Sequence, residues 1–525
     1  MLNKAKLLWS TVRHLKPTQI KYQMLYRLKK PGKLSNYSAT FSWDKIIWLD
    51  FKGNPPVYSC LSKNLTFTFL NKSKQFEGDV DWNFQEFGRL WNYNLQYGNF
   101  LLQEDISIQV RIELILSLYR SLQDGRLALE PYPASLRIMN LIRFISTNKI
   151  KHQEIIEYLS AEVNFLYTYP EYHLLGNHLL ENGFALMMGG AFFNQSKWIE
   201  KGKRIVKAQL TEQILDDGGH FELSPMYHQI ILFRVLEMID WYSNHPHKDK
   251  VLDKQLVDKG TQMLTWLQNV TYSTGDIPHF NDSADGVAYA SQWLLDFGKT
   301  LGLNPSSIEL GESGFRAVNF DAYECRIDIG QLGAQYQPGH AHADALSFVL
   351  YASGKPIFVE VGTSTYEANA KRQYERSTKA HNTVVIGDSN QSQVYGGFRV
   401  GERAKTQIDN DSKEVIVASH DGYKKKYGVI HTRKFSFHDS DITLEDSLNR
   451  SVEAKAYFHI YPEFDIKPVD QYHFAISDLV IGFEEPINID IVNYQYSNGF
   501  NSSSKALCLV VTFKERLVTK IDFKP

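Results

Sequence analysis

Hydrophobic residues in the first 310 or so positions recur every three or four residues, the spacing of one face of an α-helix. The clearest run follows Asp105, which we expect to be its N-cap, and ends at Asp124-Gly125. Its apolar face holds Ile108, Ile112, Ile115, Tyr119 and Leu122. Further helices are predicted at about 134–146, 153–167, 176–192, 197–215, 225–243 and 258–270. Consecutive helices without strands between them indicate hairpins wrapped into a toroid or a solenoid.

After about residue 310 the hydrophobic period changes to two, as in Cys325-Arg-Ile-Asp-Ile329. The predicted strands are ALSFVLYA, PIFVEV, NTVVIG, EVIVAS, ITLEDSL, AYFHIY, LVIGF, INIDIVNY and ALCLVVTF, with turn-rich breaks between them. So many strands without helices indicate a large antiparallel β-sandwich. We therefore expect a helical domain over 1–310 and a β domain over 311–525.

Composition excludes several classes of protein. The 525 residues are 43% hydrophobic and 22% charged, which is typical of globular domains. A net charge of −2 argues against a nucleic-acid-binding surface, which needs a basic excess. Cys60, Cys325 and Cys508 lie far apart, so we expect neither a disulfide framework nor a cysteine metal site.

The N-terminal sequence interrupts its apolar residues with charges every three or four positions. It has neither the apolar core nor the cleavage site of a secretory signal, and no apolar stretch is long enough for a transmembrane helix. The sequence therefore predicts a cytoplasmic protein. The mixed basic and apolar start favours a packed amphipathic helix, with contact to a membrane surface as the alternative.

A first polar cluster lies within Glu171-Tyr-His-Leu-Leu-Gly-Asn-His-Leu-Leu-Glu181. Asn177 and His178 stand at the start of a predicted helix, and Glu181 follows one turn later. An apolar core does not require Asn, His and Glu together at one helix end. Helix capping is the alternative to a functional role.

A second cluster is Asp217-Gly-Gly-His-Phe-Glu-Leu-Ser-Pro-Met-Tyr-His228. Ser224-Pro225 is a helix-start signal, an N-cap followed by proline at the first helical position. Tyr227 then lies in the first turn, where the helix dipole favours a phenolate. A hydrogen-bonded packing role is the alternative for a single tyrosine.

A third cluster contains His340 and His342, which project to one face if the chain is extended there. Glu360 and His381 follow downstream. His342, Glu360 and His381 form a two-histidine, one-carboxylate set that suits a divalent metal, with Zn²⁺ as the first choice. A hydrogen-bonded histidine pair without metal is the alternative.

The chain resembles the heparinase II/III-like family, relatives of heparinases II and III and of certain alginate lyases. The resemblance extends over most of the chain and depends on the order and spacing of its motifs. In the first half these are LWNYNLQYGNFL, EPYPASLRIMNLIRF, GNHLLENGFAL and DGGHFELSPMYH; in the second they are GHAHADALSF, EVGTSTY, YERSTKAHNTV and HTRKFSF. The resemblance implies an (α/α) toroid followed by an antiparallel β-sandwich, with a cleft between them.

The resemblance also implies roles for individual residues. Asn177 and His178 match the pair that faces a uronate carboxyl group, while Tyr227 and His340 match the catalytic tyrosine and histidine. His342 and His381 match metal ligands that hold a structural divalent ion; Glu360 stands where aspartate is more usual. The positions that match residues lining the cleft are Glu181, Arg376 and Asn382.

The implied activity is β-elimination from an acidic, uronate-containing polysaccharide, within exopolysaccharide or capsule metabolism and in the cytoplasm or periplasm. A uronyl C5-epimerase is the first alternative, because epimerisation begins with abstraction of the same C5 proton. A non-catalytic glycan-binding or assembly protein is the second. No P-loop, nucleophile elbow or dinucleotide-binding glycine pattern competes with these interpretations.

Overall fold

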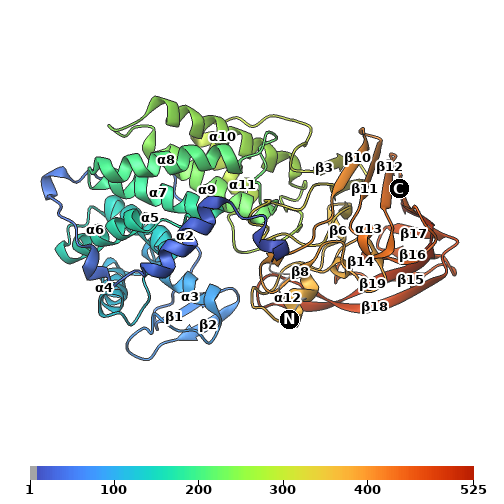
Figure 1. Ribbon diagram of the computed structural model, residues 1–525, viewed down its shortest axis with the longest axis horizontal. Helices are drawn as coiled ribbons and strands as arrows, with labels where there is room; N and C mark the ends of the chain where they lie inside the picture. Colours follow the sequence, from blue (N-terminus) through green and yellow to red (C-terminus); the bar gives the residue numbers. More distant parts are fainter. Residues whose placement is uncertain (1–8, 525) are drawn as a thin grey trace.

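The computed structural model describes residues 9–524, with the helical part at one end of the long axis and the sheets at the other (Figure 1). The helices are α2 (Pro17–Leu28), α3 (Arg89–Gln96), α4 (Ile108–Asp124), α5 (Pro131–Asn148), α6 (Gln153–Thr168), α7 (Gly176–Phe192), α8 (Ser196–Gln213), α9 (Pro225–Tyr242), α10 (Lys250–Val270) and α11 (Ser291–Thr300). A short hairpin of β1 (Thr66–Phe69) and β2 (Lys72–Gln75) precedes α3. The pattern of the sequence favoured an amphipathic helix near the N-terminus, where α2 lies, but did not predict α3, α11 or the first turns of α10.

Helix ends follow local chemistry. The Ser107 hydroxyl accepts a hydrogen bond from the Val110 N–H and caps α4. The predicted N-cap, Asp105, was wrong, because it lies two residues too early to reach the first free N–H groups. Ser224 caps α9 as predicted, through a hydrogen bond from the Tyr227 N–H.

Burial separates the helices into two layers. Nearly every residue of α5, α7 and α9 is buried, whereas α4, α6, α8 and α10 are buried mainly along one face. A helix buried on all sides lies inside a helical layer, and one with a single apolar stripe lies on its outside. The alternation of inner and outer helices along the chain confirms the predicted (α/α) toroid.

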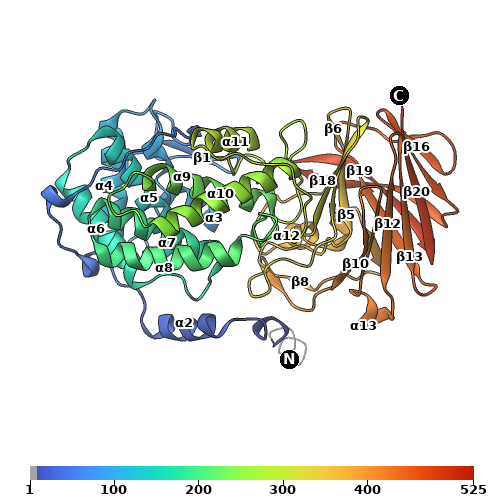
Figure 2. The same ribbon diagram turned by 90° about the horizontal axis from the view of Figure 1, so that it is seen from above.

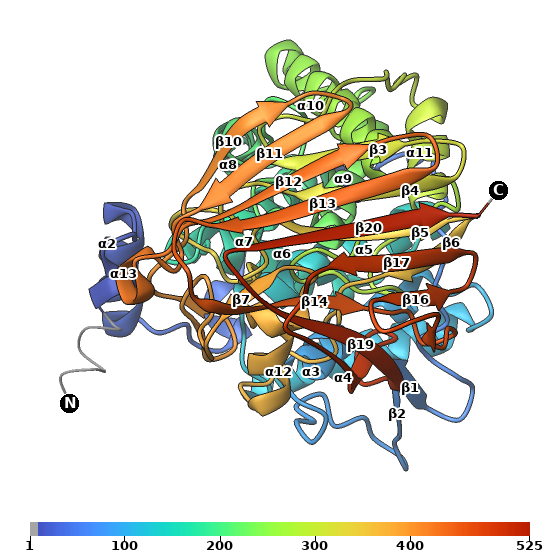
Figure 3. The same ribbon diagram turned by 90° about the vertical axis from the view of Figure 1, so that its right-hand side faces the viewer.

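The C-terminal strands pair only antiparallel, as predicted for a sandwich. One four-stranded sheet has the order β3-β4-β5-β6, a second β18-β19-β14-β7, and an eight-stranded sheet β10-β11-β12-β13-β20-β17-β16-β15. Figures 2 and 3 show the eight-stranded sheet at the end farthest from the helices. The strands are β3 (Phe315–Asn319), β4 (Tyr323–Asp328), β5 (Ser347–Ala352), β6 (Lys355–Phe358), β7 (Val384–Ile386), β8 (Val394–Tyr395), β9 (Arg399–Val400), β10 (Thr406–Asp411), β11 (Val415–His420), β12 (His431–Phe437), β13 (Asp441–Leu448), β14 (Glu453–His459), β15 (Lys467–Pro468), β16 (His473–Ile476), β17 (Leu479–Glu484), β18 (Asn488–Ser497), β19 (Ser503–Lys514) and β20 (Arg516–Phe523).

The sheets pack through one apolar core. Its members include Phe348 of β5, Phe435 of β12 and Phe458 of β14, all buried. Two short helices, α12 (Ala370–Glu375) and α13 (Lys424–Tyr427), interrupt the strand order. Cys60, Cys325 and Cys508 are free and buried.

Helices and sheets meet in a packed junction. α11 ends at Thr300 and β3 begins at Phe315, so the predicted boundary near 310 lies in the segment between them. Trp266 of α10 and Phe315 belong to one buried cluster, and the Arg326 guanidinium donates to the carbonyl of Val270. The site described below lies where residues from both parts meet.

Within residues 9–524, no helix has the length and apolar character required to cross a bilayer. The first eight residues, on which part of the prediction about a signal sequence rests, lie outside the described residues. The compartment stays a prediction from the sequence.

Candidate active site

The start of α7 brings two predicted residues to the junction. Leu175 and Gly176 both have positive φ, 63° and 58°, which turns the chain sharply into the helix. A Cβ on Gly176 would lie 2.6 Å from the Gln337 Oε1, which could shift aside, so the positive φ is the stronger reason for glycine here. Asn177 then lies in the first turn, and its Oδ1 is buried without a hydrogen-bond partner.

His178 lies among acidic side chains. Its Nδ1 lies 3.2 Å from the Glu171 Oε1, and its ring packs against Tyr132 with the centroids 4.2 Å apart. Burial alone would lower the pKa of His178, but Glu171 and Glu222 outweigh it and raise that pKa. His178 is therefore held toward its cationic form, which suits an anionic ligand.

The Tyr227 ring packs closely against the His340 ring, tilted by 31°. Their ring centroids are 3.9 Å apart, and the Tyr366 hydroxyl donates to the Tyr227 hydroxyl over 3.2 Å. Burial raises the pKa of Tyr227 well above its usual range, and Tyr366 adds to the rise. The expectation that the helix dipole favours a phenolate was wrong, because burial outweighs the dipole here. Tyr227 rests as a neutral phenol.

Glu222 is the residue around which the others gather. Both of its carboxyl oxygens are buried without a side-chain hydrogen bond, and burial raises its pKa. The Asn177 backbone lies beside it and acts against that rise in pKa, and the His340 Nε2 lies 3.8 Å from its Oε2. Asn177, His178, Glu222, Tyr227 and His340 are called the reaction cluster below.

Asp282 connects this cluster to a second one. It is fully buried and accepts from the His340 Nδ1 over 2.9 Å and from the His342 Nε2 over 2.8 Å. Burial alone would raise its pKa, but Arg372 and the two imidazoles hold the pKa of Asp282 well below its usual range. An ionised carboxylate only accepts hydrogen bonds, so each imidazole carries its proton on the nitrogen that faces Asp282. In a neutral ring the other nitrogen then carries the lone pair.

The second cluster is formed by His342, Asp344 and His381, called the buried histidine cluster below. One potential ligand atom from each residue lies within 4.8 Å of the others. The His342 Nδ1, the Asp344 Oδ2 and the His381 Nε2 are all buried without a hydrogen-bond partner. Three inward atoms of this kind, two imidazole nitrogens and a carboxylate oxygen, match the donor set of a Zn²⁺ site.

Glu360 supports the buried histidine cluster from behind. Its carboxylate contacts the His381 Nδ1 and accepts from the Ser347 hydroxyl. A carboxylate on the outer nitrogen of a metal-binding histidine orients the ring and increases its basicity. In this geometry Asp344, rather than the predicted Glu360, stands as the third member of the ligand set beside His342 and His381.

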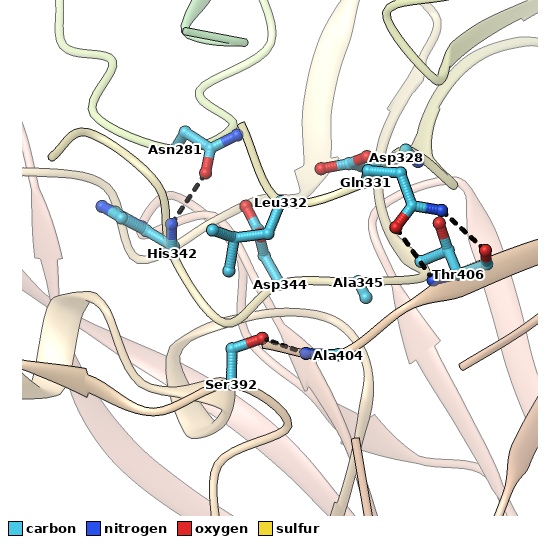
Figure 4. Close-up of a pocket in the computed structure, with 11 residues that line it drawn as sticks. Asn281, Asp328, Gln331, Leu332, His342, Asp344, Ala345, Ser392, Ala404 and Thr406 are labelled. Carbon is cyan, nitrogen blue, oxygen red and sulfur yellow. Dashed lines mark hydrogen bonds between the residues drawn. The ribbon is translucent and has the colours of Figure 1, made fainter. Parts of the chain in front are cut away.

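The surroundings of this cluster are acidic. Burial raises the pKa of Asp344 to about 6, and burial with the neighbouring Asp344 raises that of Asp328. Both residues line a small cavity of about 10 Å³, together with His342, whose N–H donates to the Asn281 Oδ1 over 2.8 Å (Figure 4). Buried carboxyl groups without a fixed cation nearby are stabilised when a metal ion supplies the charge. The residues fit a divalent ion.

Three residues predicted to line a cleft lie in other surroundings. Arg376 is fully buried and its guanidinium donates to the Ala341 carbonyl, which holds the segment between the two histidines. Asn382 is also buried and bonds backbone groups of Phe348, Val359 and His459. The Glu181 carboxylate is buried with Arg234, 3.5 Å away. A sugar could contact these groups only after a rearrangement.

Glu222, Asp282, Asp344 and Tyr366 were not selected from the sequence. Glu222, Asp344 and Tyr366 lie within motifs already quoted; Asp344 is two residues from His342, and Glu222 is five from Tyr227. Asp282 lies in Asn281-Asp-Ser-Ala-Asp-Gly286, which resembles an ordinary turn. Only the fold brings it beside the histidines.

Comparisons with known proteins place the chain among relatives of known family. Residues 130–306 match the family model described as the heparinase II/III N-terminus, and residues 303–524 match the one described as heparinase II/III-like, C-terminal. The heparin-sulfate lyase of Bacteroides stercoris is 24% identical over 298 residues, which are 51% of this chain and 43% of that protein. The aligned part is thus less than half the length of that curated relative.

Solved structures show the same fold. The crystal structure of heparinase III superposes with a TM-score of 0.68 at 16% identity, covering 97% of this chain and 92% of that one. The heparan sulfate lyase of Pedobacter heparinus superposes with a TM-score of 0.59 at 14% identity, covering 97% and 88%. At these identities the likeness establishes the arrangement of helical and β domains.

Proposed function

This chain belongs to the heparinase II/III-like family, and we propose that it is a polysaccharide lyase that cleaves acidic, uronate-containing glycans by β-elimination. One observation carries the proposal: Asn177, Tyr227 and His340 come from three distant segments, yet the Tyr227 and His340 rings pack together, and Asn177 and His340 both lie beside Glu222. Local folding gives no reason for this convergence. The side chains of His178 and His340 are partly open to solvent, so a glycan has access from that side.

The reaction needs a means of stabilising charge. Removing the C5 proton of a uronate generates an enolate-like state on the adjacent carboxyl group. The Asn177 side-chain amide supplies N–H donors, and His178, with its raised pKa, supplies a positive charge for that group. Such preorganised groups act most strongly where charge develops in the transition state.

Proton transfer is carried out by Tyr227 and His340, whose rings pack together. Because Asp282 holds the proton on the His340 Nδ1, the His340 Nε2 presents a lone pair and acts as the base toward C5. Tyr227 rests as a neutral phenol and donates its proton to the leaving O4 oxygen. Each positioned proton transfer contributes roughly 10²–10⁴-fold in rate.

The buried histidine cluster has a supporting role in this proposal. His342, Asp344 and His381 hold a divalent ion, with Zn²⁺ as the first choice, and Glu360 orients His381. The ion supplies positive charge that neutralises the buried carboxylates. The buried histidine cluster itself fixes the segment that carries His340, because His342 is only two residues further along the chain.

The test is product analysis on a panel of uronate polysaccharides, including heparan sulfate, hyaluronan and alginate. A lyase forms an unsaturated uronate, seen as new ultraviolet absorbance, and His340→Gln should abolish it. The exposed His473→Gln serves as the matched control and should retain it.

Two other outcomes would overturn the proposal. Inversion at C5 without new absorbance would identify an epimerase. Binding of a glycan that stays chemically unchanged would identify a non-catalytic role. Participation in exopolysaccharide or capsule metabolism remains part of the proposal and depends on which glycan of the panel is cleaved.

A further inference from the structure

The helix α2 lies along the outside of the molecule (Figure 2) and packs on residues 170–174, which lead into α7. Its inward face is polar and aromatic. The Gln19 Nε2 donates to the Leu174 carbonyl over 3.1 Å, and the Tyr26 hydroxyl donates to the Pro170 carbonyl over 2.6 Å. The Tyr22 ring packs on Tyr172, with the centroids 4.7 Å apart. These contacts fix which side of α2 faces the protein.

The outward face is apolar. Ile20, Met24 and Leu28 follow each other at intervals of four residues and so form one row, with Leu25 beside it. Met24 is 62% exposed and Leu28 is 83% exposed. An ordinary surface helix turns its apolar stripe inward and its polar face to water. α2 does the reverse, which indicates that another apolar phase covers this row.

Charge identifies that phase. The first 43 residues contain nine lysines and arginines and no aspartate or glutamate, although the whole chain has a net charge of −2. On and beside α2, Lys21, Arg27, Lys29 and Lys30 are exposed next to the apolar row. Trp9, 68% exposed, precedes the helix. Basic side chains flanking an exposed apolar row are typical of helices that lie in the interface of an anionic bilayer.

We propose that α2 docks on the surface of an anionic lipid membrane, with Ile20, Met24 and Leu28 entering the acyl boundary and the flanking cations on the headgroups. An acidic glycan offers the cations a partner but offers the apolar row nothing. The docking orients the catalytic end of the molecule, because α2 packs on residues 170–174, directly before Asn177 and His178. The proposal does not depend on the lyase activity.

The experiment is sedimentation of the full-length protein with lipid vesicles. One set contains phosphatidylcholine alone and the other about 30% phosphatidylglycerol in phosphatidylcholine, which supplies the anionic surface. We expect the protein to sediment with the second set and to remain in solution with the first. Raising the salt from about 0.1 M to about 1 M shortens the Debye length from about 10 Å to about 3 Å and should release it.

Two variants separate the apolar row from the charges. Met24→Gln with Leu28→Gln removes the apolar row, and Lys29→Gln with Lys30→Gln removes two cations. Each pair should lower vesicle affinity by roughly tenfold or more. The matched control is Val469→Gln with Ile487→Gln, two exposed apolar residues of the β domain, which should bind like the wild type.

Several results would overturn the proposal. One is that the wild type sediments equally with both vesicle sets, or with neither. Another is that Met24→Gln with Leu28→Gln dissociates a dimer, as seen by light scattering, without changing vesicle binding. That result would assign the apolar row to contact with a second copy of the chain. A third is that the same variant weakens retention on immobilised alginate and leaves vesicle binding intact. That result would assign this face of α2 to glycan binding.

Discussion

His340 and His342 are two residues apart and differ in almost everything that decides what an imidazole can do. The His340 side chain is 15% exposed and faces the Tyr227 ring and the Glu222 carboxyl group. The His342 side chain is 1% exposed and faces His381, at 5.3 Å between ring centroids. Burial lowers the pKa of His342 to about 3, so it stays neutral at physiological pH.

The difference teaches how one short segment can serve two purposes. A group that exchanges protons with a substrate must be reachable, whereas a group that holds an ion must be neutral and protected from water. Asp282 serves both, because it fixes the proton position on each ring. The following predictions test whether the reaction cluster and the buried histidine cluster are distinct in function, and whether Asp282 couples them.

Tyr227→Phe should give the largest effect. The change keeps the ring packed against His340 and removes only the hydroxyl that donates the proton. We expect turnover to fall by roughly 10²-fold or more, with little change in the unfolding temperature. The measurement is the rate of ultraviolet absorbance increase, together with thermal unfolding. Tyr158→Phe, a half-buried tyrosine of α6, is the control and should retain full turnover; undiminished turnover in Tyr227→Phe would end this mechanism.

Asp282→Asn should affect both clusters at once. An amide can accept from one imidazole but offers an N–H to the other, so one ring must change its proton position or turn. We expect kcat to fall by roughly 10–100-fold at nearly unchanged KM, together with loss of bound metal. The control is Asp240→Asn, another buried carboxylate, which accepts backbone N–H groups of Lys52 and Gly53. Equal effects of the two variants on kcat and metal content would mean that Asp282 has no special coupling role.

Removal of metal should act on stability more than on chemistry. Elemental analysis should find one ion per chain. A chelator should lower the unfolding temperature by about 5 °C, which is the stabilisation expected when the free ion concentration is about 100 times Kd. His381→Ala should remove this sensitivity to the chelator, and His245→Ala, a buried histidine of the helical part, should not. A protein that contains no metal after expression with zinc, and that is unaffected by chelator, would leave a plain hydrogen-bonded cluster.

The two clusters were not equally predictable from the sequence. Periodicity predicted the long helices and the strands, because each buries a regular stripe. His340 and His342 stood out because two polar rings alternate with alanine, where a buried strand would carry apolar residues. Asp282 did not stand out, because its role is created by a contact with positions nearly 60 residues away. Arg376 matched a family motif, yet the motif could not reveal that its guanidinium bonds backbone carbonyls instead of facing solvent.

α2 shows a different limit. Its apolar residues follow a helical period, but its outward face is the apolar one, so the inference that apolar residues face the core fails there. The interpretation of the N-terminal segment as either a packed amphipathic helix or a membrane contact was left open by the sequence. The hydrogen bonds of Gln19 and Tyr26 decide which face is packed.

The smallest predicted effect compares two buried carboxyl groups that neighbour the reaction cluster, Asp282 beside His340 and Glu181 near His178. Arg372 and two imidazoles keep Asp282 ionised, whereas burial raises the pKa of Glu181 to about 7 despite Arg234. A carboxyl group whose folded pKa exceeds its unfolded value binds its proton more tightly in the folded protein. Its contribution to stability is therefore fully present below the unfolded pKa, near 4.3, and is lost as the pH rises through the folded pKa.

Glu181→Gln removes this titration while keeping the size of the side chain. Between about pH 5 and about pH 8, the wild type should lose roughly 1–3 kcal/mol more unfolding free energy than the variant, since one pKa unit corresponds to 1.36 kcal/mol. Urea unfolding at both pH values measures the difference, and Glu154→Gln, on the exposed side of α6, should follow the wild type. Parallel pH profiles for Glu181→Gln and the wild type would show that Arg234 keeps Glu181 ionised, so that both carboxyl groups are charge-paired alike.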